Sequence, residues 1–250
     1  MDVSRLKLTI AYDGSNYAGF QWQPNDISVQ QRLEEAFQKI YPSFKRVHGS
    51  SRTDTGVHAR GMVAHVDVPQ TRSEMNPSKL RLAINANLPE DIRVSLIQRV
   101  SSNFHARFDA KGKQYRYSIW NHPAMDPLRR TQAWHVPRKL NVSLIEDAAS
   151  RFIGKHDFES FANCRSYKMK DYVRTLTRCD VQRRGSLLTI VIEGDGFLYK
   201  MCRGIAGTLI RVGEEKLKPS EITRILKSRD RRVAGMTAPA HGLVLWKVFY

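Results

Sequence analysis

Hydrophobic side chains recur with two different periods in the first hundred residues, and these periods predict strands and helices in turn. Apolar and polar residues alternate over 6–11, which is typical of a half-buried strand. A spacing of four from Val29 to Leu33 and Phe37 instead predicts an amphipathic helix, which Ser28 opens with a capping-box sequence. The expected elements are a strand at 6–11, a helix from Val29 to Pro42, a strand through Val47, a strand at 62–68, a helix from Asn76-Pro77 and a strand at 92–100.

The rest of the chain repeats this order of elements. A second capping-box sequence begins at Ser143 and predicts a helix that stops at Gly154, with Leu144, Ala148 and Ile153 on its apolar side. The sequence Arg183-Arg184-Gly185 is a hairpin signal between two strands. The expected elements are strands at 114–120, 172–182, 187–193 and 243–249, with helices at 143–153, at about 197–212 and from Pro219.

Each half therefore reads β-α-β-β-α-β, the order of a ferredoxin-like unit. Helices gathered on antiparallel sheets define the α+β class. We expect the two ferredoxin-like halves to share one extended, mostly antiparallel sheet flanked by helices, because no linker is long enough for independent motion. The polar stretch Ser101-Ser102-Asn103 sets the boundary between an N-terminal domain, residues 1–102, and a C-terminal domain, residues 103–250.

The charge balance indicates a polyanionic partner. The 250 residues include 41 Lys and Arg against 24 Asp and Glu, which gives a net charge of +17. A folded domain this basic usually binds a polyanion, although charge alone leaves RNA, DNA and an anionic membrane open. With 41% hydrophobic residues the chain can also fold around a substantial core.

Cysteine spacing and hydropathy bear on metal binding and on the cellular compartment of the protein. Cys164, Cys179 and Cys202 lack metal-ligand spacing, so a structural zinc site is not expected, and their sparse, odd number suits a reducing cytosol. No apolar run approaches the roughly 18 residues that a membrane helix needs. Met1 leads directly into a strand pattern without a signal peptide. We therefore expect a cytoplasmic protein without a membrane segment.

The loop from Gly49 to Ala59 is the richest candidate for chemistry, since it lies between two expected strands and combines two glycines with four small hydroxyl residues. Such a loop can approach a ligand closely. If Arg52 and Asp54 entered one cleft, the guanidinium would keep the carboxylate ionised, able to act as nucleophile or base. A β-turn in which Asp54 caps a backbone N–H is the alternative, which physical argument alone favours.

Five segments carry distinctive sequences in a fixed order. They are Tyr12-Asp13-Gly14 with Tyr17, Gly19, Gln21 and Gln23; Arg52-Thr53-Asp54 with Gly56-Val57-His58-Ala59; Lys113 with Tyr115 and Tyr117; Asp195-Gly196-Phe197 with Met201, Arg203 and Gly207; and Ala238-Pro239-Ala240 with Gly242-Leu243. Together they resemble the motifs of the TruA family of tRNA pseudouridine synthases, and they span nearly the whole chain.

The resemblance implies roles for five residues. Asp54 matches the family's catalytic aspartate, and Arg52 matches the arginine associated with extruding the target uridine from the helix stack. Tyr115 matches the tyrosine that packs on the target base. Arg203 matches a basic residue near the catalytic carboxylate, and Leu243 matches an apolar residue that lines the base pocket.

The implied reaction needs neither a cofactor nor a metal, because breaking N1–C1′, turning the base and rejoining it through C5 adds and removes no atom. A stacked uridine must first be flipped out, at a cost of roughly a few kcal/mol. A covalent adduct of Asp54 and proton abstraction from the ribose, leading to a glycal, both remain open. The resemblance further implies a homodimer that acts on uridines 38, 39 and 40 of the tRNA anticodon stem-loop.

Several alternatives stay open at this point. The chain could be a pseudouridine synthase for other RNA positions, a non-catalytic RNA-binding protein on the same scaffold, or a basic DNA-binding protein. The intact Arg52-Thr53-Asp54 argues against the non-catalytic alternative.

Individual residues carry alternatives of their own. Tyr115 and Tyr117 share a sheet face, so at least one is expected in the core. Arg203 belongs to a polar helical stripe that is either solvated or faces RNA, with Gly204 and Gly207 admitting a phosphate. His58 is expected to be a structural hydrogen-bonding residue. A basic region around the second hairpin fits either phosphate contact or a solvated surface: Lys168, Lys170, Arg174, Arg178, Arg183 and Arg184.

Overall fold

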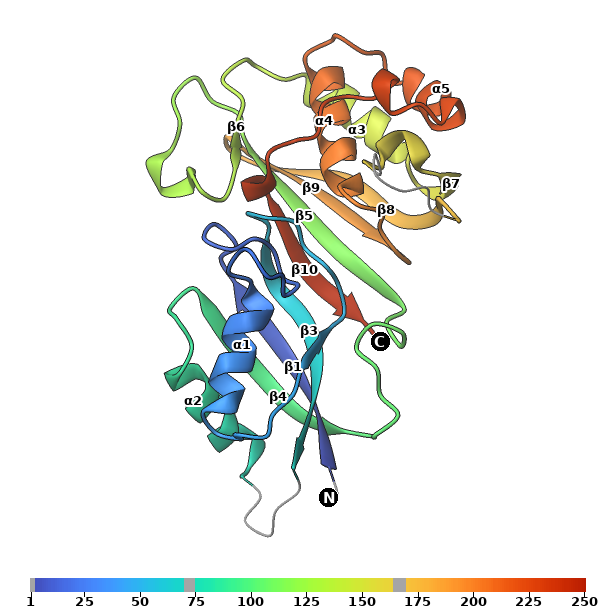
Figure 1. The fold of residues 1–250 in the computed structure, drawn as a ribbon. Helices are drawn as coiled ribbons and strands as arrows, with labels where there is room; N and C mark the ends of the chain where they lie inside the picture. The colour runs from blue at the N-terminus through green and yellow to red at the C-terminus, as the bar shows by residue number, and fades with distance from the viewer. Residues whose placement is uncertain (1–2, 70–74, 164–169) are drawn as a thin grey trace. The chain divides into compact units, whose positions relative to one another are not determined.

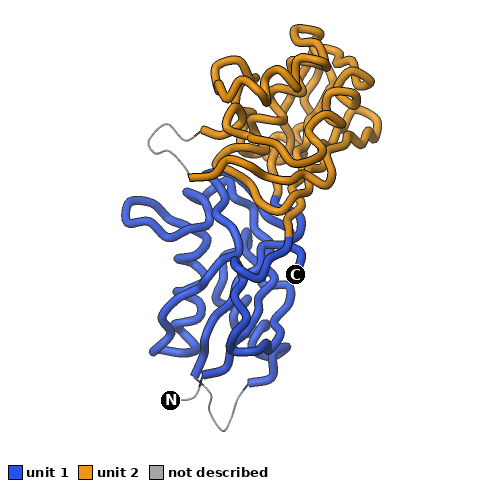
Figure 2. Tube along the Cα trace, turned by 90° about the vertical axis from the view of Figure 1, so that its right-hand side faces the viewer, with its two compact units in different colours: residues 1–111, 245–250 blue, residues 112–244 orange. Residues whose placement is uncertain are grey.

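The structure, a computed structural model, describes residues 3–69, 75–163 and 170–250, which form two compact units (Figures 1 and 2). Unit 1 comprises residues 1–111 and 245–250, and unit 2 comprises residues 112–244. Cys164 and Lys168, both named above, lie outside the described residues.

Unit 1 is an antiparallel sheet with two helices (Figure 1). Its elements are β1 (Val3–Tyr12), α1 (Val29–Gln38), β2 (Val47–Gly49), β3 (His58–Pro69), α2 (Pro77–Ala86) and β4 (Ile92–Val100). β1 lies between β3 and β4, and β2 pairs with residues 64–66 of β3. The order β-α-β-β-α-β expected for a ferredoxin-like unit is confirmed here.

The predicted periodicities build the core of unit 1. Alternation along β1 buries Leu8 and Ile10, and the four-residue spacing along α1 buries Leu33 and Phe37, all with no exposed surface. The side chain of Ser28 accepts a hydrogen bond from the N–H of Gln31 at 3.2 Å, so the predicted cap of α1 is confirmed.

Unit 2 holds the other strands of the same 10-stranded sheet, so the one extended, mostly antiparallel sheet that the sequence predicts is confirmed. The strands of unit 2 pack against helices α3 and α4 (Figure 1). Its elements are β5 (Gly112–Trp120), β6 (Trp134–His135), α3 (Val142–Ser150), β7 (Gly154–Asp157), β8 (Val173–Arg184), β9 (Leu187–Gly194), α4 (Met201–Gly213) and α5 (Glu221–Ser228). The strand order is β5-β9-β8-β7, with β6 added in parallel to β5. β10 (Leu243–Phe249) begins in unit 2 and ends in unit 1. The α+β class with mostly antiparallel strands and flanking helices is confirmed.

Helices α3 and α4 of unit 2 differ from the sequence prediction. α3 begins after Asn141, whose side chain accepts from the N–H of Leu144, and so Ser143 lies inside the helix. Ile153 lies beyond the end of α3 and is 46% exposed. α4 begins at Met201 and not near 197, because Lys200 has a left-handed backbone with φ of 59° that a helix cannot include.

The unit boundary falls at residue 111 and not at the expected 102, because the intervening residues are tied to unit 1. Arg5 donates to the carbonyl of Phe104 at 3.0 Å, and the N–H of Ala106 donates to Nδ1 of His65 at 3.1 Å. The hydroxyl of Tyr250 donates to the carbonyl of Ala106 at 2.6 Å. The polar stretch at 101–103 therefore marks a turn within unit 1.

In the parts of the chain that the structure describes, no helix has the length and apolar character needed to cross a membrane.

Candidate active site

The loop between β2 and β3 presents Arg52 and Asp54 on unit 1. Arg52 is exposed and Asp54 is half-buried. The N–H of Val57 donates to the carbonyl of Asp54 at 3.1 Å, and Gly56 has a positive φ of 76°. These residues form a β-turn with glycine at the position that favours positive φ. The expected backbone turn is therefore present, and Asp54 opens it.

A second loop, residues 13–28, holds the Asp54 loop in place. The N–H of Phe20 donates to the carbonyl of Thr53, and the N–H of Gly56 donates to the carbonyl of Tyr17, both at 3.3 Å. A Cβ on Gly19 would lie 2.3 Å from the carbonyl oxygen of Thr53, and Gly19 has a φ of 90°. The two backbones can approach this closely only because residue 19 has no side chain.

Buried hydrogen bonds of polar side chains also hold the Asp54 loop and its neighbouring loop. The hydroxyls of Tyr12 and Thr53 lie 2.8 Å apart in a buried hydrogen bond. Burial raises the pKa of Tyr12 well above its ordinary value, so the phenol stays protonated and can donate. Nδ1 of His58, a residue only 5% exposed, accepts from the N–H of Gly14 at 3.0 Å. His58 is thus the structural hydrogen-bonding residue that the sequence predicts.

Tyr115 lies on β5 of unit 2 and is 7% exposed. Its ring packs edge-to-face on Phe197, with ring centroids 5.0 Å apart. Tyr117, two residues along the same face, is fully buried and donates to the carbonyl of Pro239 at 2.8 Å. Tyr117 is therefore the core member of the pair.

Arg203 and Leu243 are joined through the segment that leads into β10. Nε of Arg203 donates to the carbonyl of Ala238 at 2.7 Å, and the N–H of Ala238 donates back to the carbonyl of Arg203 at 3.1 Å. Gly242 lies against the ring of Tyr117, where a Cβ would be 2.7 Å from Cζ. Leu243 follows directly and is 6% exposed. The segment 238–243 thus contacts Arg203 at one end and Tyr117 at the other.

Gly204 and Gly207 of α4 lie against the backbone of other segments of unit 2. A Cβ on Gly207 would lie 1.8 Å from the carbonyl oxygen of Met236, and one on Gly204 would lie 2.8 Å from that of Phe161. The protein's own backbone fills the space that a phosphate would need. The expectation that these glycines could admit a phosphate is therefore wrong.

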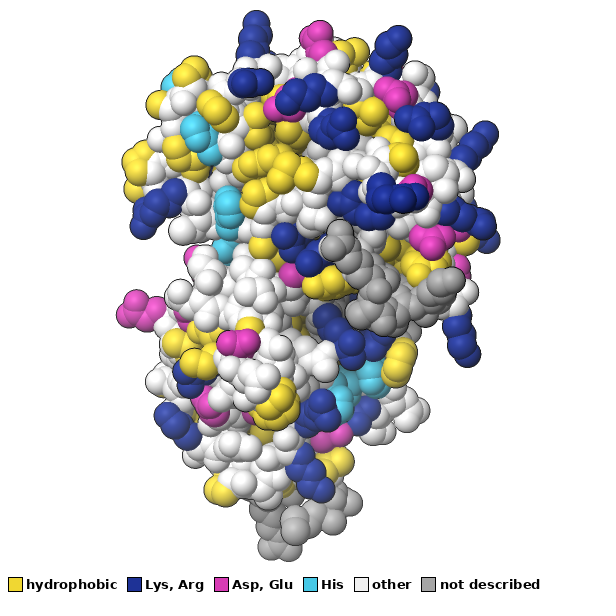
Figure 3. All heavy atoms as spheres, turned by 45° about the horizontal axis from the view of Figure 1, so that its top comes forward, with side chains coloured by type: hydrophobic (Ala, Val, Ile, Leu, Met, Phe, Trp, Pro, Cys, Tyr) yellow, Lys and Arg dark blue, Asp and Glu magenta, His cyan; other side chains and the backbone are white. Residues whose placement is uncertain are grey.

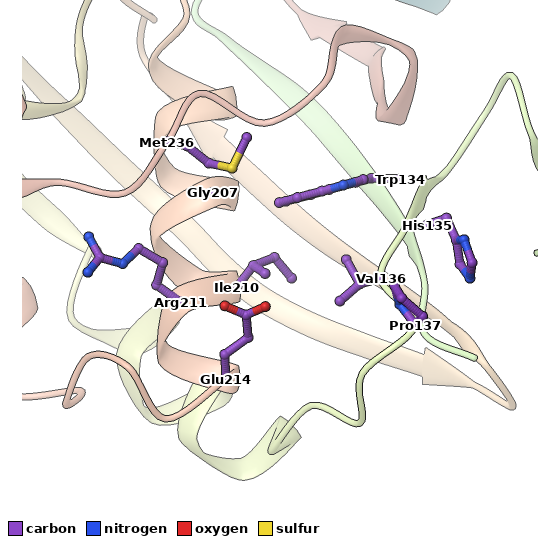
Figure 4. Close-up of a pocket in the computed structure, with 9 residues that line it drawn as sticks. All are labelled: Trp134, His135, Val136, Pro137, Gly207, Ile210, Arg211, Glu214 and Met236. Carbon is purple, nitrogen blue, oxygen red and sulfur yellow. The ribbon is translucent and has the colours of Figure 1, made fainter. Parts of the chain in front are cut away.

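Two surface pockets of unit 2 have none of the five predicted residues in their lining. One, of about 190 Å³, lies between the β6 segment and α4 and has mostly apolar walls, including Trp134, Ile210 and Met236 (Figure 4). The other, of about 510 Å³, is lined in part by Arg229 and Arg231. Within the described ranges, no three His, Cys, Asp or Glu side chains form a group suited to a metal ion.

The five predicted residues thus divide between the units. Arg52 and Asp54 share one loop of unit 1, and Tyr115, Arg203 and Leu243 belong to unit 2. Thr53 and Phe197 lie in two of the five motifs, but no role was expected for either residue. Their place in a motif marked both residues, but their contacts could not be inferred because the partners, Tyr12 and Tyr115, are distant in sequence.

Comparison with known proteins decides the family. A family model described as tRNA pseudouridine synthase matches residues 8–109 and 148–250. The chain belongs to this family. It is accordingly an isomerase that forms pseudouridine, and the resemblance drawn from five motifs is confirmed.

Relatives in this family are similar over their full length. A tRNA pseudouridine synthase A from Brevibacillus brevis is 42% identical, covering 99% of this chain and 100% of the relative. A tRNA pseudouridine synthase A from Geobacillus kaustophilus is 44% identical, covering 99% of this chain and 95% of the relative. A chain in the crystal structure of a Cbf5-Nop10-Gar1 complex aligns over 82% of this chain and 45% of its own, but 11% identity and a TM-score of 0.34 are too low to support an argument.

Proposed function

We propose that the enzyme isomerises uridines 38, 39 and 40 in the anticodon stem-loop of tRNA, with Asp54 as its catalytic carboxylate. Full-length similarity to proteins named tRNA pseudouridine synthase A supports the substrate. The observation that carries the role of Asp54 is the anchoring of its loop, whose backbone is hydrogen-bonded at Thr53 and Gly56 to the neighbouring loop. A carboxylate held this way needs little reorganisation to meet a flipped nucleotide.

Arg52 suits the base-flipping step. Its side chain is exposed and lies two positions before Asp54 in the same loop. Extruding a stacked uridine costs roughly a few kcal/mol and leaves a gap in the stack. A long planar guanidinium can fill that gap and stack on the bases beside it.

The bond changes balance without a cofactor or a metal. The N1–C1′ bond breaks, the uracil turns, and a C5–C1′ bond forms. The proton on C5 then leaves to solvent while N1 gains one. Asp54 assists either as a nucleophile or as a base toward the ribose, and both routes return it to its starting state.

Tyr115, Arg203 and Leu243 serve the base pocket in this proposal. The aromatic and apolar side chains hold the freed uracil while it turns, and the cation stabilises negative charge that develops in the reaction. A tRNA partner suits the net charge of +17. Lys and Arg side chains are spread widely over the surface seen in Figure 3. We further propose that the enzyme acts as a homodimer.

The test is tritium release from tRNA that carries 5-³H-uridine, with Asp54→Asn beside the wild type. Asparagine keeps the shape but is neither a nucleophile nor a base here, so we expect release to fall at least about a thousandfold with tRNA binding retained. Substrates with single substitutions at nucleotides 38, 39 and 40 then map the positions. Full release by Asp54→Asn would overturn the catalytic assignment.

Arg203→Ala provides a second test. We expect the rate at saturating tRNA to fall about a hundredfold, because one transition-state contact is lost. Loss of the bond to the Ala238 carbonyl should also lower the stability by about 1 kcal/mol. Urea unfolding separates the two effects. A wild-type rate in this variant would show that Arg203 has no catalytic role and serves only through its hydrogen bond to the Ala238 carbonyl.

A further inference from the structure

The segment of residues 121–139, here called the arm, connects β5 to α3 in unit 2. It includes β6 and projects to the left of that strand in Figure 1. It also lies outside the two ranges that the family model matches. Its role is therefore not covered by what the family match describes.

The arm is braced by hydrogen bonds along its length. Nε1 of Trp120 donates to the carbonyl of Ala124, and Nδ2 of Asn121 donates to that of Val136, both at 2.9 Å. Nε2 of His135 lies 2.8 Å from the carbonyl of His122. The bonds of Asn121 and His135 join the two ends of the arm, so its base is held in one shape before any partner binds.

A short 3-10 turn, Pro127–Arg129, forms the tip of the arm. The side chain of Asp126 caps this turn by accepting from the N–H of Leu128 at 3.0 Å. Leu128 is 87% exposed. Arg129 and Arg130, which follow it, are also exposed. A preformed turn thus presents one apolar side chain with two guanidinium groups beside it.

Charge favours RNA as the partner of this tip. The arm has four cationic residues, Arg129, Arg130, Arg138 and Lys139, against one carboxylate, Asp126. Asp126 accepts from Nε of Arg129 at 3.1 Å, so the pair engages one N–H of that guanidinium and leaves its terminal N–H groups for a phosphate. A phosphate backbone attracts these cationic side chains.

We propose that the tip of the arm binds the sugar-phosphate backbone of the tRNA at nucleotides other than the target uridine. Arg129 and Arg130 contact phosphates, and Leu128 packs on a ribose or on the face of an unstacked base. Such contacts position the RNA without reading its sequence. This inference rests on the proposed function for its substrate, but it assigns a binding surface distinct from the residues proposed for catalysis.

The experiment measures tRNA binding by filter retention at several KCl concentrations, using Asp54→Asn protein so that no turnover occurs. The variants are R129Q/R130Q and Leu128→Ala. The matched control is K155Q/K227Q, which removes the same charge from exposed positions elsewhere in unit 2. Thermal unfolding and light scattering verify the fold and the oligomeric mass of each variant.

R129Q/R130Q should weaken binding about tenfold near 0.1 M salt and lower the slope of log affinity against log salt by about 2, because two phosphate contacts are lost. Leu128→Ala should weaken binding about three- to tenfold with the slope unchanged, since the lost contact is apolar. The control should bind as the parent does.

Three outcomes would overturn the proposal. The first is equal weakening by the control, which would mean that only total charge matters. The second is wild-type affinity in both arm variants. The third is a changed oligomeric mass in Leu128→Ala with unchanged affinity, which would make the arm a contact between copies. Tritium release retained by Asp54→Asn would refute the catalytic assignment alone, because the affinity differences do not depend on turnover.

Discussion

Two glycines decide how closely the loops of unit 1 can approach. A Cβ on Gly14 would lie 2.1 Å from the carbonyl oxygen of Val57, and one on Gly19 would lie 2.3 Å from that of Thr53. The sequence marked both glycines as motif positions but gave no reason for them. The reason is the backbone of a loop more than thirty residues away, which no local pattern reveals. Local composition could identify the Asp54 loop, but not what holds it.

Gly19→Ala should therefore destabilise the protein far more than Gly185→Ala. Both residues have positive φ, but a Cβ on Gly185 would meet nothing within 4 Å. We expect a loss of about 1 kcal/mol for Gly185→Ala from backbone strain alone, and about 3 kcal/mol or more for Gly19→Ala, where a collision adds to the strain. Urea unfolding measures both variants. Equal losses would show that the loops separate at little cost.

At the scale of elements, two long strands were predicted with their observed bounds, and two short strands were missed. β4 and β10 have the expected bounds. Each strand is at least seven residues long, which is enough for the pattern of apolar residues to show in the sequence. β6 and β7 have two and four residues, too few for a period to show. The cap of α3 was misassigned because Asn141 and Ser143 both suit an N-cap, and only the structure shows which side chain bonds the helix.

Asn141→Ala should cost about 1 kcal/mol of stability, because the N–H of Leu144 loses its acceptor. Ser143→Ala should change the stability by less than about 0.5 kcal/mol, since this exposed side chain lies within the helix. Thermal unfolding of the two variants compares the sites directly. A larger loss for Ser143→Ala would restore the capping box that the sequence predicts.

At the scale of the molecule, the connection between the units is held to unit 1 by a group of histidines. His65 stacks on His48, with ring centroids 4.8 Å apart, and packs edge-on against His105 at 4.7 Å. Burial lowers the pKa of His65 to about 4, and the positive charges of His48 and Arg5 contribute. Nδ1 of His65 must stay unprotonated to accept from Ala106. No local pattern around residues 101–103 reveals this contact between Ala106 and His65.

Acid should therefore weaken unit 1. The folded pKa of His65 lies below its unfolded value of 6.5, so the unfolded chain binds more protons between these values and stability falls as the pH drops through that window. Between pH 7 and 5 we expect this residue to account for a loss of about 2 kcal/mol. Urea unfolding at both pH values gives the loss, and His65→Gln should reduce it. A pH dependence that is identical in His65→Gln would assign the effect to other groups.

The division of unit 1 into two stretches of chain has a consequence for biosynthesis. Residues 245–250 pack with residues 1–111, so closely that a Cβ on Gly61 would lie 2.6 Å from the carbonyl oxygen of Trp246. The ribosome must make all of unit 2 before it reaches them. The unit that carries Asp54 therefore cannot be completed while unit 2 is still being translated, and a nascent chain stalled within unit 2 would expose an unfinished sheet edge to chaperones and proteases.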